Sequence, residues 1–229
     1  MSTLDLSLKR FLLPKINPEG WRFVLIAAVL SLLLGAIRWP LLIPGFLLTV
    51  FVYLFFRDPE RVPPKDPDVV VSPADGIVCM IVETPLPREL SADETPVWRV
   101  SVFMSMFNVH VNRMPADGTI AKACYVPGKF FNASLDKASV DNERYLYLMR
   151  AESGQWMAFV QIAGLVARRI VCFVREGQSL ALGERFGLIR FGSRVDLYLP
   201  PGIVPDVEVG QIAVAGETVV ARLKPLAKA

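Results

Sequence analysis

Two uncharged apolar runs near the N-terminus restrict the fold of this chain more than any other feature. Residues 23–37 and 39–56 carry no charge, and only Arg38 separates them. A helix needs about 20 predominantly apolar residues to span a bilayer, so each run lies near the lower limit. Pro40 and Pro44 interrupt the second run. The pattern predicts two short helices that associate with a membrane.

The charges around these runs predict how such a hairpin is oriented. Basic residues precede the first run and follow the second, namely Lys9, Arg10, Lys15 and Arg22 and then Arg57, Arg61 and Lys65. Positive charge favours the cytoplasmic side. We therefore expect a hairpin over residues 1–58 at the cell (inner) membrane, with the rest of the chain on the cytoplasmic face. A re-entrant or interfacial helix pair fits equally well, whereas the second run argues against a signal peptide.

The remainder of the chain predicts a β-rich domain. Residues 59–67 form a proline-rich connector, and residues 68–229 hold short apolar segments bounded by turn residues. The expected strands are residues 69–71, 76–83, 98–103, 118–126, 144–151, 156–162, 169–174, 195–199 and 218–223. The fold class is α+β, with a mostly antiparallel β domain. Residues 71–78 and 207–218 look like the hairpins of lipoyl or biotinyl carrier domains.

Composition and charge argue against nucleic acid as a binding partner. The chain is 53% hydrophobic with a net charge of only +3, and no recognition motif or basic stripe indicates nucleic acid. The three cysteines, Cys79, Cys124 and Cys172, are scattered, lie in apolar surroundings and show no metal-ligand spacing. They predict reduced thiols packed in a cytoplasmic core.

The pair Gly192-Ser193, just before an expected strand, is the first candidate for chemistry. Glycine leaves its carbonyl unshielded and permits strained backbone angles, so the Ser193 hydroxyl can attack the preceding peptide bond. An N-to-O acyl shift and β-elimination would cut the chain and turn Ser193 into an N-terminal pyruvoyl group, a ketone that acts as an electron sink. An ordinary turn has the same sequence, so the pair needs support from elsewhere.

His110 and Asp75 are the second and third candidates. His110 is the single histidine, at the end of a strand-like segment, and imidazole accepts and returns protons near neutral pH. Asp75 lies in a Pro-Ala-Asp-Gly turn, and its carboxylate could orient His110 as the third member of a serine, base and orienter set. A hydrogen-bonded structural histidine and plain turn chemistry are the simpler interpretations.

Together these segments resemble the phosphatidylserine decarboxylase family, in its short prokaryotic branch, over nearly the whole chain from residue 55. The resemblance is carried by FFRDPER at 55–61, SPADG at 72–76, FNVHVNR at 107–113, PGKFFNA at 127–133, DKAS at 136–139, and GERFG at 183–187 through Gly192-Ser193. It implies self-cleavage between Gly192 and Ser193, into a large and a small chain that stay associated. It also implies roles for Asp75 and His110 in cleavage or decarboxylation.

The same resemblance implies the reaction. Phosphatidylserine at a membrane surface would be decarboxylated to phosphatidylethanolamine through a Schiff base to the pyruvoyl group made from Ser193, as a step of phospholipid biosynthesis. The cofactor would be this covalent pyruvoyl group, with no metal and no pyridoxal phosphate.

Three arginines mark departures or additions. Arg194 follows the serine where longer members of the family have threonine, and Arg113 stands where they tend to have a second histidine. Arginine stays protonated, so Arg113 can clamp a carboxylate or phosphate but is a poor base, and the base that serves Ser193 is left open. Arg168 is a candidate phosphate clamp or a solvated residue, because only one member of the neighbouring pair Arg168-Arg169 can face a site.

Two alternatives remain. A membrane-tethered, carrier-like scaffold without catalysis would need no chemistry at Ser193, although neither carrier-like segment has the lysine that a swinging arm requires. A decarboxylase of a related serine-headgroup lipid would use the same residues, because such a lipid presents the same amine, carboxylate and phosphate.

Overall fold

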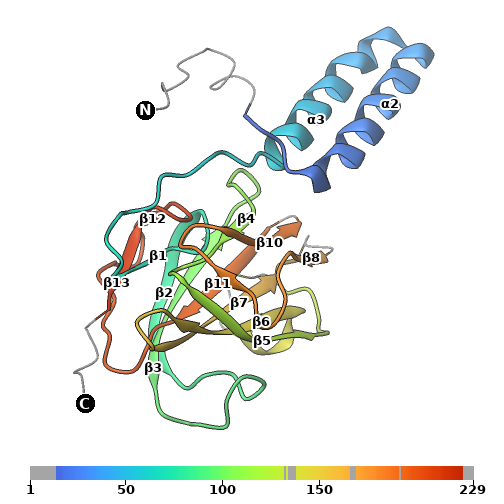
Figure 1. Cartoon of the computed structure of the whole chain (residues 1–229). Helices are drawn as coiled ribbons and strands as arrows, with labels where there is room; N and C mark the ends of the chain where they lie inside the picture. Colours follow the sequence, from blue (N-terminus) through green and yellow to red (C-terminus); the bar gives the residue numbers. More distant parts are fainter. Residues whose placement is uncertain (1–13, 132, 134–137, 166–168, 191, 224–229) are drawn as a thin grey trace. The chain divides into compact units, whose positions relative to one another are not determined.

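The computed structural model describes residues 14–131, 133, 138–165, 169–190 and 192–223 (Figure 1). The chain divides into two compact units, Met1–Glu60 and Arg61–Ala229. The finer division at residues 58 and 67 that the sequence suggests stays a prediction.

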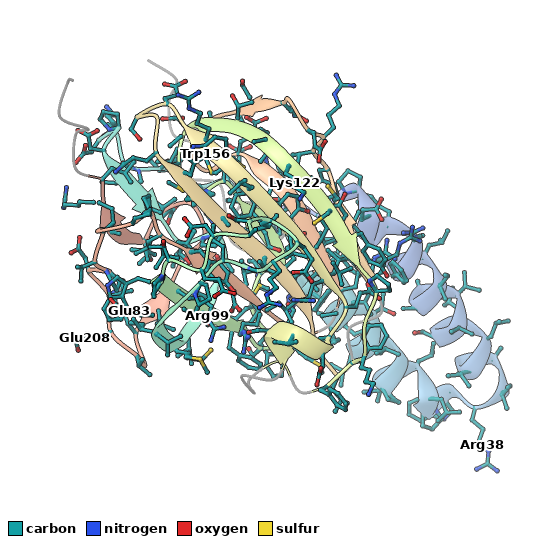
Figure 2. The ribbon with its side chains drawn as sticks, turned by 90° about the horizontal axis from the view of Figure 1, so that it is seen from below. Arg38, Glu83, Arg99, Lys122, Trp156 and Glu208 are labelled. Atoms are coloured by element: carbon teal, nitrogen blue, oxygen red, sulfur yellow. The ribbon has the colours of Figure 1, made fainter. Side chains whose placement is uncertain are left out.

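The first unit holds the predicted pair of apolar helices. Its elements are η1 (Pro18–Gly20), α2 (Trp21–Ile37), η2 (Trp39–Leu41) and α3 (Leu42–Phe55). Arg38 ends α2 in an extended conformation, and Figure 2 shows its side chain pointing away from the two helices. Pro40 lies in η2 and Pro44 in the first turn of α3, where a missing backbone N–H leaves no helical bond unmade. The prolines therefore set where α3 begins.

Small residues let α2 and α3 pack closely. The hydroxyl oxygens of Ser31 and Thr49 are 3.1 Å apart, and a Cβ added at Gly45 would lie 2.7 Å from the Ser31 Cβ. Each hydroxyl also lies within hydrogen-bond distance of a carbonyl one turn back, Ser31 with Ala27 at 2.7 Å and Thr49 with Gly45 at 2.9 Å. Contacts of this kind are typical of helices that pack in a bilayer.

The outer faces of both helices are apolar. More than half of each of five large side chains is exposed: Leu25, Leu32, Leu33, Phe46 and Leu47. Within the described residues one helical segment, Pro18–Ile37, is long and apolar enough to cross a membrane, with 20 residues and a mean hydropathy of 2.1. The segment Trp39–Phe55 is shorter. Length and composition alone also fit a signal sequence, so membrane placement is argued with the function below.

The second unit is built from antiparallel β-sheets. An eight-stranded sheet has the order β12 (Ile212–Ala213), β2 (Gly76–Thr84), β3 (Val97–Met104), β11 (Ser193–Tyr198), β7 (Trp156–Ala163), β6 (Arg144–Ala151), β5 (Gly118–Val126) and β9 (Ser179–Leu180). A three-stranded sheet has the order β4 (Val111–Arg113), β10 (Arg185–Arg190) and β8 (Arg169–Cys172). β1 (Val69–Val71) pairs with β13 (Val219–Arg222), and a short helix, α4 (Ala138–Asp141), precedes β6. The predicted α+β class with a mostly antiparallel β domain is confirmed.

The main core lies on one face of the large sheet. Alternate residues of β11, Val195 and Leu197, belong to it, and an aromatic group joins β6 and β7 to β10. In that group the Tyr147 and Phe159 rings stack at 5.0 Å, and Phe186 lies 4.6 Å from Phe159. The three-stranded sheet is thereby held close to the centre of the large one.

Most expected strands are present, and the structure adds an important strand, β10, that the sequence did not predict. β10 was not expected, because its sequence was considered only for its motif at 183–187. The strand expected at 195–199 begins at Ser193, so the serine lies inside β11 and not before it. The likeness of two segments to carrier-domain hairpins stays a prediction.

Candidate active site

The Gly192-Ser193 junction lies where the chain passes from one sheet to the other. β10 ends at Arg190 in the small sheet, and β11 begins at Ser193 in the middle of the large sheet (Figure 1). Ser193 is fully buried and pairs with Met104 of β3 on one side and Ala163 of β7 on the other. Directly opposite residues of paired strands face the same side, so the serine points toward the main core with Met104. Its hydroxyl lies 4.0 Å from the Met104 sulfur.

Gly192 has a backbone that other residues avoid. Its φ is +61°, in the left-handed region, and a Cβ placed there would meet nothing within 4 Å. Glycine is therefore favoured by backbone angle and not by crowding. The Gly192 carbonyl accepts a hydrogen bond of 3.1 Å from the amide of Gly164.

His110 lies on the other side of the same residue. The Gly192 amide donates to His110 Nε2 at 3.3 Å, and Nδ1 lies 3.0 Å from the Asn108 carbonyl oxygen. Because an amide only donates, Nε2 must carry the lone pair and Nδ1 the proton, which it donates to Asn108. The fully buried imidazole is thus neutral, with its basic nitrogen next to the proposed cleavage junction.

A chain of buried polar groups leads to Met104. Burial raises the pKa of Tyr147 well above its usual value, so its hydroxyl keeps its proton and donates to Gln161 Oε1 at 2.8 Å. Gln161 Nε2 then donates to Asn112 Oδ1 at 2.8 Å, and Asn112 Nδ2 lies 3.6 Å from the Met104 sulfur. Each bond fixes the orientation of the next amide, so this chain holds the methionine that faces Ser193.

Asp75 lies in the turn between β1 and β2. Its Oδ2 accepts from Arg61 at 2.7 Å and its Oδ1 from the Ala215 amide at 2.8 Å. The turn touches the strand that follows His110, because the Arg113 amide donates to the Pro73 carbonyl at 2.9 Å. The structure therefore brings the Asp75 turn beside the histidine strand, and the role of Asp75 in orienting His110 stays a prediction.

The two candidate substrate-binding arginines are Arg113 and Arg168, and Arg169 is the neighbour of the second. Arg113 is buried, and its guanidinium donates to the Gly183 carbonyl at 2.9 Å. Arg169 opens β8 and is exposed. Arg168 lies outside the described residues, so its predicted role as a phosphate clamp is neither supported nor opposed.

Arg194 sits in a buried polar cluster on the opposite face of β11 from Ser193. Its Nε lies 2.8 Å from Asp196 Oδ1, and its guanidinium donates to the Ala133 carbonyl at 3.0 Å and to the Ser139 hydroxyl. Ser139 in turn donates to Asp196 at 2.9 Å. Figure 2 labels Arg99, which donates to Ser139 at 3.2 Å from β3. The residue after the serine therefore ties β11 to described parts of the segment that carries the PGKFFNA and DKAS motifs.

A cavity of about 300 Å³ reaches the junction. Its lining comes from the end of β3 and the residues after it, from Ala133, from the two residues that follow β7, and from the junction itself: Phe103, Met104, Ser105, Met106, Ala133, Gly164, Leu165 and Gly192. Gly192 lines the cavity, and Met104, which faces the buried Ser193, lines it too, so a small group made from Ser193 would lie next to this space. The junction therefore fits a pyruvoyl group.

The cysteines and acidic residues offer no second centre among the described residues. No group of three or more His, Cys, Asp or Glu side chains there could hold a metal ion. The three cysteines are free, and burial raises the pKa of Cys79 and Cys124. The thiols of Cys79 and Cys124 are therefore weak nucleophiles.

Sequence reasoning missed Gly164, Asn112 and Met104. The one local signal at Gly164 is that a glycine at the end of a strand can mark a close backbone contact. Nothing in the local sequence of Met104 distinguishes it from other core residues, because its role depends on strand pairing.

Comparisons with known proteins find relatives over most of the chain. A family model described as phosphatidylserine decarboxylase matches residues 48–221. The phosphatidylserine decarboxylase proenzyme of Paramagnetospirillum magneticum is 56% identical over 219 residues, 96% of this chain and 91% of that protein. Proenzymes of the same name from Ruegeria pomeroyi and Rhodospirillum rubrum are 56% and 51% identical, over 93% and 97% of this chain.

The fold and this degree of similarity define an enzyme of phospholipid metabolism, in the decarboxylase class. The chain belongs to the phosphatidylserine decarboxylase family, which confirms the resemblance drawn from the motifs. The matched region contains Asp75, His110, Gly192 and Ser193.

Proposed function

We propose that the chain is synthesised as a precursor that cuts itself between Gly192 and Ser193. The mature enzyme then decarboxylates phosphatidylserine to phosphatidylethanolamine. The geometry of the junction carries this proposal. The buried Ser193 follows a glycine whose φ lies in the left-handed region, and the amide of that glycine donates a hydrogen bond to the basic nitrogen of a neutral imidazole. The proenzyme names of the curated relatives support the same reading.

We propose one role for each candidate site residue. Ser193 is the nucleophile of self-cleavage and the precursor of the pyruvoyl group, which supplies an electron sink for the pair released when carbon dioxide leaves. His110 moves protons at Nε2, during self-cleavage or when a proton returns to carbon. Asp75 is proposed to help position the strand that follows His110, because its turn accepts the Arg113 amide at the Pro73 carbonyl. Arg113 and Arg168 are proposed to contact the carboxylate or phosphate of the headgroup.

The cavity supports a lipid substrate. Leu165 lines it and is 69% exposed, and Phe107, next to the lining residue Met106, is 75% exposed. Exposed apolar groups in this lining and next to it in sequence favour a lipid surface over bulk water. The headgroup could then reach Gly192 while the acyl chains stay in the bilayer.

The helix pair is proposed to anchor the enzyme at the inner membrane, with the catalytic domain on the cytoplasmic face. An impermeant maleimide added outside spheroplasts should label an Arg38→Cys variant if the hairpin spans the bilayer, with the parent chain as the control for labelling of Cys79, Cys124 and Cys172. Labelling only after lysis would place the hairpin in the inner leaflet.

The two chains should stay together after the cut. β11 begins the small chain and is paired along its whole length with β3 and β7, both of which belong to the large chain. β13 adds a further pairing with β1.

The test of processing is the intact mass of the purified protein under denaturing conditions, beside a Ser193→Ala variant. We expect a large chain ending at Gly192 and a small chain whose mass fits an N-terminal pyruvoyl group in place of serine, and a single chain for the variant. An uncut parent chain would favour the alternative of a carrier-like scaffold without catalysis.

The test of activity is carbon dioxide release from vesicles of phosphatidylcholine that contain phosphatidylserine. A serine-headgroup ether lipid in matched vesicles asks whether a related lipid is preferred. Release that is equal in the parent and in Ser193→Ala would contradict the assignment of Ser193.

A further inference from the structure

The amide of Gly164 donates a hydrogen bond to the carbonyl oxygen of Gly192, the residue on the N-terminal side of the proposed cut. The N to O distance is 3.1 Å. Gly164 directly follows Ala163, the last residue of β7, which pairs with Ser193. The strand register that places the serine in the sheet therefore also places this amide beside the carbonyl of Gly192.

That carbonyl oxygen changes charge during the acyl shift. As the Ser193 hydroxyl gives its proton to a base, Oγ bonds to the Gly192 carbon and the carbonyl π pair moves onto oxygen. The pair then returns, the bond from carbon to the Ser193 nitrogen breaks, and the nitrogen takes up a proton to leave an ester. A donor fixed on the oxygen stabilises the intermediate more than the neutral carbonyl.

We propose that the Gly164 N–H is an oxyanion donor for self-cleavage, and thus a catalytic group of the precursor. This inference rests on the proposed function, because it concerns the same bond. The present distance lies at the long end of the range for such donors, so the bond can shorten as negative charge develops.

The identity of residue 164 supports this role. A Cβ added at Gly164 would lie 2.3 Å from the Gly192 oxygen and 3.0 Å from its carbon. Both are backbone atoms of the residue that directly precedes β11, so the carbonyl would have to move away from the amide. Glycine is needed here for close approach, in contrast to Gly192, which is favoured by its backbone angle.

The direct test removes the N–H and leaves the side chain unchanged. Glycolic acid replaces Gly164 during cell-free synthesis of the full chain with lipid nanodiscs, which converts the amide into an ester. The matched control carries the same replacement at Gly177, whose amide donates to the Ile120 carbonyl at 2.7 Å in another part of the domain. Conversion of labelled precursor is followed by mass after synthesis is stopped.

We expect the Gly164 ester chain to cut about 100-fold more slowly than the parent, or slower, while the Gly177 ester chain stays within about threefold. The uncut Gly164 ester chain should also resist trypsin as well as the Ser193→Ala precursor does. Cutting at the parental rate would overturn the oxyanion role while leaving the proposed function intact. A trypsin-sensitive chain would assign the hydrogen bond a structural role and would also overturn it.

A second variant checks the step that is affected. Gly164→Ala should accumulate precursor that hydroxylamine does not cut at residues 192–193, because the ester never forms. Accumulation of a hydroxylamine-sensitive ester would place the defect in β-elimination and contradict the inference. An uncut parent chain would instead refute the proposed function.

Discussion

The Gly192 amide donates its hydrogen to Nε2 of His110, so the imidazole presents its lone pair beside the residue that precedes Ser193. Nδ1 carries the proton and donates it to the Asn108 carbonyl oxygen, at an N to O distance of 3.0 Å. Two distinct functions meet at this nitrogen, since it fixes the junction and can also accept a proton.

His110→Gln separates these two functions. A glutamine oxygen can accept the Gly192 hydrogen bond but cannot take up a proton near neutral pH. We expect a folded precursor with a melting temperature close to that of Ser193→Ala, whose processing is slowed about 100-fold or more. His110→Leu should lose stability as well, because it leaves the amide unpaired. Processing of the glutamine variant at the parental rate would exclude proton transfer by His110.

Gly192→Ala should slow processing through backbone strain. At a φ of +61° an alanine costs about 1 to 2 kcal/mol, and relaxation would rotate the carbonyl away from its partners. Gly202→Ala is the matched control, because Gly202 has a φ of +76° and equally open surroundings. Both variants should unfold at lower denaturant concentration, yet only the first should accumulate precursor. Equal processing rates would show that the junction geometry tolerates the change.

Arg194→Met should destabilise the precursor strongly. Removing one partner of a buried ion pair costs about 3 to 5 kcal/mol, and the Arg99 guanidinium, 3.9 Å from Asp196, remains as a weaker partner, so we expect a loss of about 3 kcal/mol. Arg88→Met breaks an ion pair with Glu94 that is largely exposed, and should change stability by less than about 1 kcal/mol. Urea unfolding in the Ser193→Ala background measures both, and adding Asp196→Leu to Arg194→Met should recover part of the loss. Similar losses for the two single variants would refute a stabilising role of the buried pair.

Tyr198 should make the precursor sensitive to alkali. Burial raises its pKa from 10.0 to about 12, with Asp196 adding to the effect. Between these values the unfolded tyrosine releases its proton while the folded one keeps it, so unfolding becomes more favourable as pH rises. The contribution is intact below pH 10 and about 2 to 3 kcal/mol is lost as pH rises toward 12. Tyr198→Phe should flatten the fall in stability measured by urea unfolding, and an unchanged slope would assign it to other groups.

The helix pair can be tested by cross-linking in membranes. Because the Ser31 and Thr49 oxygens are 3.1 Å apart, Ser31→Cys with Thr49→Cys should form a disulfide on mild oxidation. Leu32→Cys with Thr49→Cys is the control, since Leu32 is 66% exposed. Gly45→Leu should abolish the first cross-link by separating the helices. Equal cross-linking of both pairs would mean that α2 and α3 do not keep this contact.

The fold class could be predicted from local patterns, because apolar runs and turn residues lie next to one another in sequence. Local patterns predict the two helices and most strands, and they single out the Gly192-Ser193 pair. β10 was missed because GERFG was considered as a motif and not as the start of a strand. Arg194 was seen as a departure, whereas its partners Ala133 and Ser139 are supplied by a distant segment.

The site was less accessible because it depends on strand register. Met104, Ala163 and Ser193 meet only because β3, β11 and β7 pair in one particular alignment. A shift of one residue would turn the serine to the other face of the sheet, and no local signal specifies that alignment. The amide of Gly164 is a backbone group, so its role could not be inferred from residue type.

The central position of β11 affects how the enzyme can be handled. A precursor that unfolds remains one molecule and can refold at any dilution. Once cut, the protein unfolds into two molecules, one of which carries the middle strand of the large sheet. Refolding then becomes bimolecular, so its yield falls with dilution and the apparent melting temperature depends on protein concentration. Maturation would thus turn a reversible equilibrium into a largely one-way loss, and the working lifetime of the enzyme would be set by how slowly that strand leaves the sheet.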